Sequence, residues 1–423
     1  MKLITLNNIC TITQLSLLIL GLVFILIAIR QIGRFHFRIW QVMLAGALAV
    51  LVTGQISPDA AIKAINPGVI TFLLSMFIIG AGFESSGLLK VSINWITNHA
   101  RSGDQLLALI IVVMGFLSAI LMNDTIAIIG GPLVLVLADR FNISKSGALL
   151  ALCFAITTGS VFSPIGNPQN YLITTYVADM SPYLLFFSGL FIPTILSLGI
   201  VWIVLRPLFK SAGQIPSQHE IIEPTDNSSR KVIYFSIFLL FLGVGMKIVY
   251  GLTGIGLSIP FEWIAVSAAI PVILFTPDRM AILKKTDWCT LIFFAAMFVL
   301  MQSVYDTGLF LDIVHHEGEG DIIGILTAGI LLSQVISNVP FVALFQPVLL
   351  SPGVSPSLVL ALAAGSTIAG NLTILGAASN VIIIQQAERE GIHISMRFFC
   401  RYGIPVTLVQ TGIYASFLMV FPM

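Results

Sequence analysis

The sequence predicts an all-α polytopic membrane protein made of two inverted repeats. Each repeat is expected to have five membrane spans and one re-entrant helical hairpin, with discontinuous helices at the membrane midplane. Of the 423 residues, 57% are hydrophobic and only 9% are charged, whereas soluble domains carry about 25% charged residues. Apolar runs of roughly 18 or more residues, each long enough to cross a bilayer, recur from end to end. A third observation is a series of motifs that occurs twice in the same order.

The apolar segments fall into three kinds. Some are uninterrupted, which predicts continuous membrane spans. The segments 147–178 and 357–390 are apolar but interrupted by Gly, Pro and Asn, which predicts broken helices. The segments 105–139 and 321–351 are apolar arms on either side of a polar centre, which predicts helical hairpins. The continuous spans are predicted at 13–30, 38–54, 68–84, 183–206, 231–251, 257–275, 287–304 and 401–421.

The distribution of Lys and Arg predicts the orientation in the membrane. With the N-terminus outside and both hairpins re-entrant, nearly all of these residues face the cytoplasm, and only Lys2, Lys63 and Lys247 lie outside. If either hairpin crossed completely, every later loop would change sides and the bias would disappear. We therefore expect a multi-pass protein of the cytoplasmic (inner) membrane. The residues on the cytoplasmic side are Arg30, Arg34, Arg38, Lys90, Arg101, Arg140, Lys145, Arg206, Lys210, Arg230, Lys231, Arg279, Lys284, Lys285, Arg389, Arg397 and Arg401.

The internal repeat predicts the domain organisation: a first inverted repeat over 1–208, a cytoplasmic linker over 209–230, and a second repeat over 231–423. Met76-Phe77 corresponds to Met297-Phe298, and SPIGNPQN (163–170) corresponds to TILGAASN (373–380). An odd number of spans in the first repeat inverts the second. Paired broken helices in inverted repeats are typical of secondary transporters with a site at the midplane.

The hairpin tips and helix breaks carry the candidate site residues. Free carbonyls and side-chain oxygens suit a hard cation such as Na⁺, and half-helix N-termini suit the oxygens of an anion. Packing between membrane helices is the competing role for such small polar residues, above all for the outlying serines. Apart from Na⁺ as a possible coupling ion, we predict no cofactor, no metal and no catalytic residue. The predicted substrate-binding residues are Asn123, Asp124, Thr125, Asn167, Asn170, Ser337, Asn338, Thr373 and Asn380. The predicted cation-binding residues are Ser118, Asn123, Gly166, Ser333, Asn338 and Gly376.

Asp124 is the one carboxylate expected deep in the membrane, where an ionisable group is costly and marks function. It has three open roles: ligand of a cation, carrier of the coupling proton, or cap of the second hairpin arm. No Lys or Arg is expected near the site, so anion binding would depend on backbone N–H groups. The net charge of +1 provides no basic face, which excludes a nucleic-acid partner.

The motifs MNDTIAIIGGPLVLVL, FSPIGNPQN, ISNVPFVALFQPVL and GSTIAGNLTILGAASNVIII resemble the ion transporter superfamily. That superfamily includes the divalent anion/sodium symporters and the ArsB/NhaD-type permeases. The symporters carry Ser-Asn-Thr at each hairpin tip. Here the second tip is Ser337-Asn338-Val339 and the first is Met122-Asn123-Asp124, which is closer to the ArsB/NhaD-type members.

What the resemblance implies goes beyond the tips. Ser118 and Ser333 match the symporters' additional sodium-coordinating hydroxyls. The resemblance also implies elevator-type motion, a homodimer, and linking arms at 87–100 and 309–316.

The leading interpretation is a secondary active transporter, a permease for a small anion coupled to Na⁺ or H⁺ in the lipid bilayer. The alternative is a Na⁺/H⁺ antiporter with Asp124 as the exchange site, although that chemistry favours several buried carboxylates. A channel does not need two broken-helix pairs. An intramembrane enzyme is disfavoured because its catalytic groups must lie at depth, whereas every histidine is expected in a loop. These residues are His36, His99, His219, His315, His316 and His393.

Overall fold

The computed structural model describes residues 15–27, 31–32, 35–36, 38–177, 181–210, 227–253, 259–308, 321–349 and 354–421. Within these ranges the chain is helical, apart from a two-stranded antiparallel ribbon of β1 (Gln31–Ile32) and β2 (Phe35–His36). Six described helices are long and apolar enough to cross a membrane. The predicted all-α, multi-pass class is thereby confirmed. The six segments are Pro67–Ser85, Gly103–Leu121, Pro182–Phe209, Ser229–Thr253, Trp288–Tyr305 and Met396–Val420.

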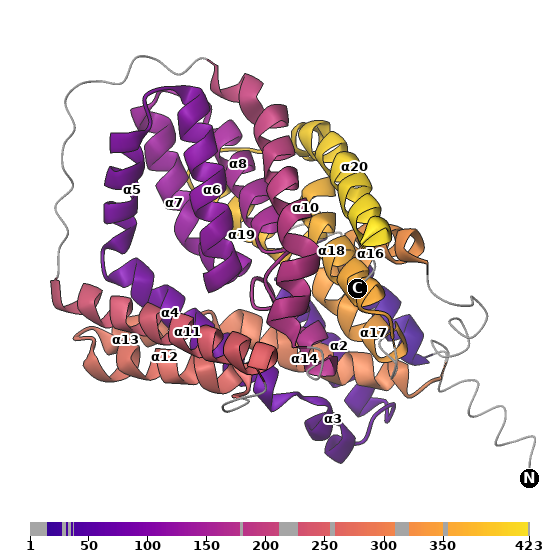
Figure 1. The fold of residues 1–423 in the computed structure, drawn as a ribbon. Helices are drawn as coiled ribbons and strands as arrows, with labels where there is room; N and C mark the ends of the chain where they lie inside the picture. The colour runs from indigo at the N-terminus through magenta and orange to yellow at the C-terminus, as the bar shows by residue number, and fades with distance from the viewer. Residues whose placement is uncertain are drawn as a thin grey trace, which may run out of the picture.

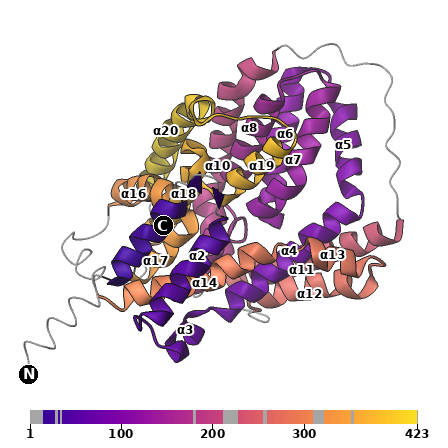
Figure 2. The same cartoon turned by 180° about the vertical axis from the view of Figure 1, so that it is seen from behind.

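The helices form two layers, which Figures 1 and 2 show from opposite sides. One, here named the α4 layer, lies along the bottom of both views, with α4 packed on α12, α11 on α12, and α2 on α14. Its members are a helix over Leu15–Ile27, α2 (Ile39–Val52), α3 (Pro58–Ala64), α4 (Pro67–Ser85), α11 (Asn227–Thr253), α12 (Phe261–Phe275), α13 (Arg279–Lys285) and α14 (Trp288–Tyr305).

The second layer, here named the hairpin layer, contains both hairpins and both broken helices. In it α6 packs on α8, α16 on α18, and α10 on α20. The helix α5 (Leu88–His99) connects the two layers and contacts α4, α6 and α7. The members are α6 (Gly103–Leu121), α7 (Asn123–Arg140), α8 (Lys145–Gly159), α9 (Pro168–Tyr176), α10 (Pro182–Leu205), η2 (Arg206–Phe209), α16 (Ile322–Ile336), α17 (Asn338–Leu349), α18 (Pro356–Leu372), η3 (Ile374–Gly376), α19 (Ala378–Arg389) and α20 (Met396–Val420).

The observed helices lie where the sequence places apolar segments, with ends that differ by a few residues. The hairpins are α6–α7 and α16–α17, and the predicted arm over 87–100 is the helix α5. The short helices α3 and α13 and the β1–β2 ribbon were not predicted, because each is too short to give a hydrophobic period. The predicted linker over 209–230 lies largely within 211–226, and the predicted arm over 309–316 lies wholly within 309–320. Both of these segments are outside the described residues.

Local sequence signals explain where several helices begin. The side chain of Asn66 accepts a hydrogen bond from the Val69 amide, and Pro67 occupies the first position of α4. Ser144 caps α8 and Ser395 caps α20 in the same way. These caps satisfy backbone N–H groups that a helix start leaves without partners.

Each hairpin turns through a single residue with a left-handed φ. Met122 has φ 71° and ψ 144°, and Ser337 has φ 66° and ψ 156°. Non-glycine residues rarely adopt such angles, which cost on the order of 1–3 kcal/mol and persist only where surrounding contacts enforce them. The two hairpins therefore share the same sharp, strained turn.

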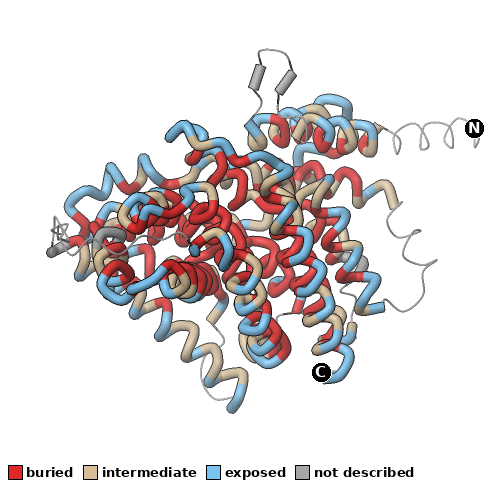
Figure 3. Tube along the Cα trace, turned by 90° about the horizontal axis from the view of Figure 1, so that it is seen from above, coloured by how far each residue is buried: buried red, intermediate tan, exposed pale blue. Residues whose placement is uncertain are grey.

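Glycines set the close approach of hairpin arms to broken helices. A Cβ on Gly159 of α8 would overlap the backbone of Gly115 on α6. In the other hairpin, a Cβ on Gly365 of α18 would lie 2.8 Å from the carbonyl oxygen of Leu326 on α16. Small residues at such crossings let membrane helices pack backbone to backbone. Figure 3 shows the resulting concentration of buried residues inside the molecule.

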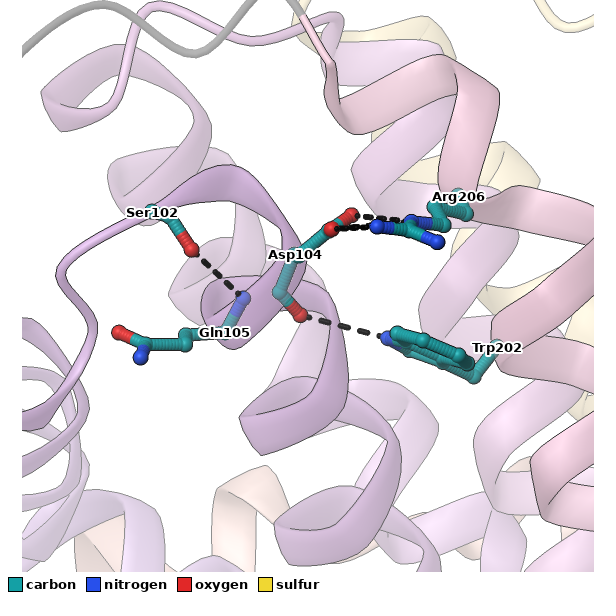
Figure 4. Close-up of polar contacts among 5 residues, drawn as sticks. All are labelled: Ser102, Asp104, Gln105, Trp202 and Arg206. Atoms are coloured by element: carbon teal, nitrogen blue, oxygen red, sulfur yellow. Dashed lines mark hydrogen bonds and ion pairs between the residues drawn. The ribbon is translucent and has the colours of Figure 1, made fainter.

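An ion pair joins the start of α6, at the end of the first hairpin far from its tip, to the end of α10. The Arg206 guanidinium donates to both carboxylate oxygens of Asp104, with Nη2 to Oδ2 at 2.6 Å, and the Trp202 indole donates to the Asp104 carbonyl (Figure 4). Ser102 caps the same helix start through the Gln105 amide. These contacts hold α6 and α10 together within the hairpin layer.

Several contacts cross between the layers. Tyr171 of α9 stacks on Phe72 of α4 at 3.9 Å between ring centroids, and its hydroxyl donates to Glu262 of α12 over 3.3 Å. The side chain of Thr125 on α7 occupies the space beside Gly80 of α4, which has no side chain of its own. Further contacts join α17 to α14 and α10 to α11.

Candidate functional site

The first helix break lies between Gly159 at the end of α8 and Pro168 at the start of α9. The Asn170 side-chain amide donates to three main-chain carbonyls across the break, those of Ser160, Val161 and Ser163, at 3.3, 3.1 and 3.0 Å. Asn170 is fully buried. Because an unpaired carbonyl in lipid costs several kcal/mol, one amide makes an irregular backbone tolerable here.

Two neighbouring residues complete this break. The side chain of Asn167 caps α9 by accepting from the main-chain N–H of Asn170 over 2.8 Å. The side-chain amide of Asn167 also donates to the Ser160 hydroxyl over 3.1 Å. A Cβ on Gly166 would overlap the Ser160 carbonyl, so only glycine fits this position. The predicted residues Gly166, Asn167 and Asn170 therefore lie together.

The second break, between Leu372 and Ala378, has the same construction. The Asn380 side-chain amide donates to the Gly370 carbonyl and, at 3.5 Å, to the Thr373 carbonyl. Thr373 caps η3. A Cβ on Gly376 would overlap the Ala369 carbonyl. The predicted Thr373, Gly376 and Asn380 therefore lie together.

Each hairpin is tied to its own broken helix. In the first, the main-chain N–H of Asn123 donates to the Gly166 carbonyl over 2.8 Å, and the Ser118 hydroxyl donates to the Ile156 carbonyl over 2.7 Å. In the second, Gln334 makes the connection by donating to the Ala369 carbonyl and accepting from the Thr373 hydroxyl over 2.7 Å. Gln334 was not predicted, because a glutamine one residue after Ser333 has no counterpart in the first hairpin.

The two breaks meet through a buried polar network. Thr367 of α18 accepts from the amides of Asn167 and Gln169 at 3.3 and 3.4 Å, and donates to Asn170 Oδ1 at 3.3 Å. Residues 167–170 and Thr367 come from opposite halves of the chain, so the breaks form one polar centre.

A second set of bonds across the halves joins α8 to α18 and α20. Asn371 of α18 donates to the hydroxyl of Thr158 on α8 and to Gln410 of α20, at 3.0 and 2.8 Å. Gln410 donates to Thr158 as well, over 3.0 Å. Gln410 lies in the middle of an apolar span, and sequence reasoning did not include it in the site.

Several buried oxygen atoms at the tips and breaks have no hydrogen-bond partner among the described residues. A buried polar atom without a partner costs about 1–3 kcal/mol. Amide, hydroxyl and carbonyl oxygens are also the ligands that hard cations prefer. These atoms are Asn123 Oδ1, Thr125 Oγ1, Thr157 Oγ1, Gln169 Oε1, Ser333 Oγ, Asn371 Oδ1, Ser379 Oγ and Asn380 Oδ1.

Four half-helices begin at the tips and breaks: α7, α9, α17 and α19. They pack in two pairs, α7 along α19 and α9 along α17, so each pair combines the two halves of the chain. No side chain caps α7 or α19. Their first N–H groups and positive dipole ends are suited to the oxygens of an anion.

The second hairpin tip is more self-contained than the first. The Asn338 Oδ1 accepts from the Val339 amide over 2.9 Å and from the Ser337 hydroxyl over 3.4 Å. Within the described part of the chain, neither Ser337 nor Asn338 hydrogen-bonds to the second break. Their role in binding stays a prediction.

Asp124 and Thr125 lie at the side of the first tip that meets the α4 layer. Asp124 is 5% exposed and Thr125 3% exposed. Thr125 lines a small pocket with Glu84, Lys285 and Asp287 from the α4 layer. The expectation that no Lys or Arg approaches the site is therefore wrong. The hydropathy pattern predicts a loop at Lys285. It lies beside the first hairpin tip only because the two layers pack against each other there.

The two-layer fold and its buried polar centre define the class of protein: an integral, multi-pass membrane transporter. Within this class the chain belongs to the citrate transporter family (CitMHS), whose model matches residues 22–353.

Proteins of the same fold and similar sequence are themselves named transporters. An uncharacterized transporter of Mycobacterium tuberculosis is 27% identical over 402 residues, covering 89% of this chain and 92% of that protein. The silicon efflux transporter of Oryza sativa is 26% identical over 445 residues, covering 88% and 90%. The crystal structure of the Alcanivorax borkumensis YdaH transporter has a TM-score of 0.56 at 16% identity, covering 97% and 99%, and it shows the shared fold.

Proposed function

We propose that this protein is a secondary active transporter for a small anion, coupled to Na⁺ or H⁺. The observation that carries the proposal is the polar centre, where buried, unpartnered oxygens such as Asn123 Oδ1 and Asn380 Oδ1 lie beside uncapped half-helix N-termini. The oxygens suit a cation and the N-termini suit an anion. Binding the two together is the basis of coupled transport.

The paired hairpins and paired helix breaks follow from two inverted repeats, over 1–208 and 231–423. A cytoplasmic linker at 209–230 joins the repeats. Asn170 and Asn380 act alike across the two breaks, and Met122 and Ser337 turn the two hairpins with nearly equal angles. The pairing of α7 with α19 and of α9 with α17 is what an in-plane pseudo-two-fold axis produces.

Na⁺ is the first candidate for the coupling ion at the breaks. In the first half its ligands would be Asn123 and the carbonyls near Gly166, with Ser118 holding the neighbouring turn of α8 in place. In the second half they would include Ser333, whose hydroxyl is buried without a partner, and the carbonyls near Gly376.

The substrate class is a small, oxygen-rich solute. The family is named for citrate and the plant relative for silicon. Among the described residues the only cation lining the pocket beside the first tip is Lys285, and it is paired with Glu84 over 2.9 Å. Substrate oxygens would therefore be bound mainly by backbone N–H groups of the half-helices and by amides such as Asn167.

We further propose that transport proceeds by an elevator motion in which the hairpin layer slides along the α4 layer. Hydrogen bonds within the hairpin layer join both halves of the chain, so this layer can move as one body. A homodimer in the cytoplasmic (inner) membrane would hold the α4 layer fixed. Within that layer α11 is the span with the least buried surface, and it is our candidate for the dimer contact.

One observation favours a second candidate function. Asp124 is a buried carboxylate, and no described residue forms a hydrogen bond or ion pair with it. Such a group can exchange Na⁺ for H⁺, which is the chemistry of an antiporter. An antiporter would build a pH gradient from a Na⁺ gradient without any anion.

A proteoliposome assay separates the two candidates. Purified protein would be tested for uptake of citrate, sulfate, arsenite and silicate, with an inward Na⁺ gradient, an inward H⁺ gradient or neither. The proposal expects uptake of one of these solutes that requires one of the gradients. A Na⁺-driven pH change that is independent of every solute would identify the antiporter. Uptake without any gradient would contradict both.

A further inference from the structure

A small pocket lies between the two layers, beside the tip of the first hairpin. From the hairpin layer it is lined by Thr125, Ile128 and Ile129, and from the α4 layer by residues of α4 and of the α13–α14 junction. The members that carry charge are Glu84, Lys285 and Asp287, all from the α4 layer. One wall of the pocket therefore belongs to each layer.

The wall from the hairpin layer presents oxygens without partners. The Thr125 hydroxyl is buried and makes no hydrogen bond to any described residue. The preceding residue, Asp124, is buried as well, and its carboxylate has no hydrogen bond or ion pair within the described ranges. A buried carboxylate is costly unless it is paired with a positive charge.

The wall from the α4 layer adds a second carboxylate. Asp287 caps α14 by accepting from the Thr290 amide over 3.1 Å and from the Thr290 hydroxyl. It is also the charged residue that acts on Asp124 electrostatically.

The lysine in this pocket does not neutralise the two aspartates. Lys285 Nζ contacts Glu84 Oε1 at 2.9 Å, and this ion pair lies at the exposed edge of the pocket. Its two charges cancel locally. Asp287 therefore lines the pocket beside the unpartnered Thr125 hydroxyl without an ion pair to any described residue, and the buried carboxylate of Asp124 directly precedes Thr125 in the chain.

We propose that Asp287, with Thr125 and Asp124, forms a binding site for a monovalent cation between the two layers. Two carboxylates and a hydroxyl provide hard oxygen ligands, and a cation between them would relieve their repulsion. The inference rests on the proposed function and names a ligand, Asp287, that lies outside the helix breaks. Because its ligands come from both layers, this site exists only while the first tip lies beside the α13–α14 junction. Occupancy by the coupling cation is thereby linked to the position of the hairpin layer.

The test uses the purified full-length protein and two matched substitutions. Asp287→Asn removes the charge but keeps the cap of α14, because asparagine caps helices as well as aspartate does. Asp278→Asn, beside α13 and outside the pocket, is the control. Thermal stability would be followed against NaCl with choline chloride holding ionic strength constant, and against pH in the absence of Na⁺.

If the cation is Na⁺, wild type and Asp278→Asn are stabilised by NaCl. Asp287→Asn then needs about tenfold more NaCl for the same effect, as expected for the loss of one charged ligand. If the cation is a proton, stabilisation follows falling pH without Na⁺, and Asp287→Asn shifts its midpoint about one unit lower. Thr125→Val likewise raises the NaCl requirement, because it removes a hydroxyl ligand.

Two results would overturn the inference. If Asp287→Asn responds to NaCl and to pH as wild type does, the coupling cation binds only at the breaks, and the proposed function survives without the interlayer site. If wild type itself responds to neither Na⁺ nor pH, the site and the proposed coupling fail together.

Discussion

The main-chain N–H of Asn123 donates to the Gly166 carbonyl over 2.8 Å, and this bond joins the tip of the first hairpin to the break of the first discontinuous helix. The residue before Asn123 is Met122, whose left-handed φ of 71° is a strained geometry for a non-glycine residue. The bond and the turn place the Asn123 side chain at the polar centre and direct the next two residues toward α4. The first hairpin tip therefore contacts the first helix break and also lies at the interface between the layers.

Asp124→Asn keeps the size of the side chain and removes its charge. We expect it to abolish coupled uptake while leaving the fold intact, because the buried carboxylate has no structural partner among the described residues. Uptake in proteoliposomes, with circular dichroism as the check on folding, measures this. Normal transport with unchanged Na⁺ and pH dependence would show that Asp124 has neither active role; the third role, a cap of the second hairpin arm, is already wrong, because no side chain caps α7.

The wild-type protein distinguishes the two active roles of Asp124. If Asp124 carries the coupling proton, uptake falls as the external pH rises, because fewer carriers hold a proton when they face outside. If Asp124 binds Na⁺ instead, uptake requires Na⁺ and changes little with pH near neutrality. Initial uptake rates over a grid of pH and Na⁺ concentrations separate these patterns.

Asn170→Ala removes three hydrogen bonds from the first break at once. Each bond is worth about 0.5–1.5 kcal/mol net, so we expect substrate binding to weaken by at least about tenfold at every pH. Asn380→Ala should have the same effect through the second break. Isothermal titration with the transported substrate tests this, and Asn98→Ala on the exposed part of α5 is the control. Wild-type affinity in Asn170→Ala would contradict a substrate site at the breaks.

Gly159→Ala should push α8 away from α6, because the new Cβ would overlap the backbone of Gly115. Overpacking of this kind costs about 1–3 kcal/mol, and the thermal midpoint in detergent should fall. Gly199→Ala on α10 is the matched control, since no atom lies within 4 Å of its Cβ position. There alanine should be neutral or stabilising through its higher helix propensity. Equal midpoints for the two variants would show that the α6–α8 contact is not close.

Orientation in the membrane is tested by labelling single cysteines in intact cells. The Lys and Arg distribution predicts that Ser355, before α18, lies outside, and that Ser102, before α6, lies inside. Ser355→Cys should react with an impermeant maleimide in intact cells, and Ser102→Cys only after permeabilisation. The reverse pattern would invert the proposed topology.

Much of this architecture could be predicted because the protein lies in a lipid bilayer. There, long apolar runs indicate membrane spans, and Gly, Pro or Asn within such a run indicates a broken helix. Gly166 and Asn170 are recognisable from sequence, since a broken helix inside a membrane requires a small residue and a side chain that satisfies its carbonyls. Gln410 was harder to identify as a site residue. Its span reads as an ordinary apolar helix, and only tertiary packing brings it to the polar centre.

The pocket residues Lys285 and Asp287 could not be placed at the tip for a different reason. Both follow an apolar span at a membrane boundary, where charged residues are normally solvated. Their position beside Thr125 depends on how the two layers pack against each other, and no local pattern in the sequence encodes that packing.

Locking the layers together tests the proposed transport mechanism directly. A Cβ at position 80 would lie 3.4 Å from the Cβ of Thr125, close to the separation in a disulfide of roughly 3.5–4.5 Å. The pair Gly80→Cys with Thr125→Cys would therefore join α4 to α7. A second lock, Gly251→Cys with Ser181→Cys, joins α11 to the start of α10 away from the binding centre, where the Cβ atoms lie 3.1 Å apart.

The decisive measurement is substrate uptake by each double-cysteine variant, oxidised and then reduced, with cross-linking quantified by mass spectrometry and the single-cysteine variants as controls. If the hairpin layer moves against the α4 layer, uptake stops in proportion to the cross-linked fraction. It returns on reduction in at least the second lock, which leaves the binding residues untouched. Full uptake by completely cross-linked protein would show that the layers do not move, and would contradict the account.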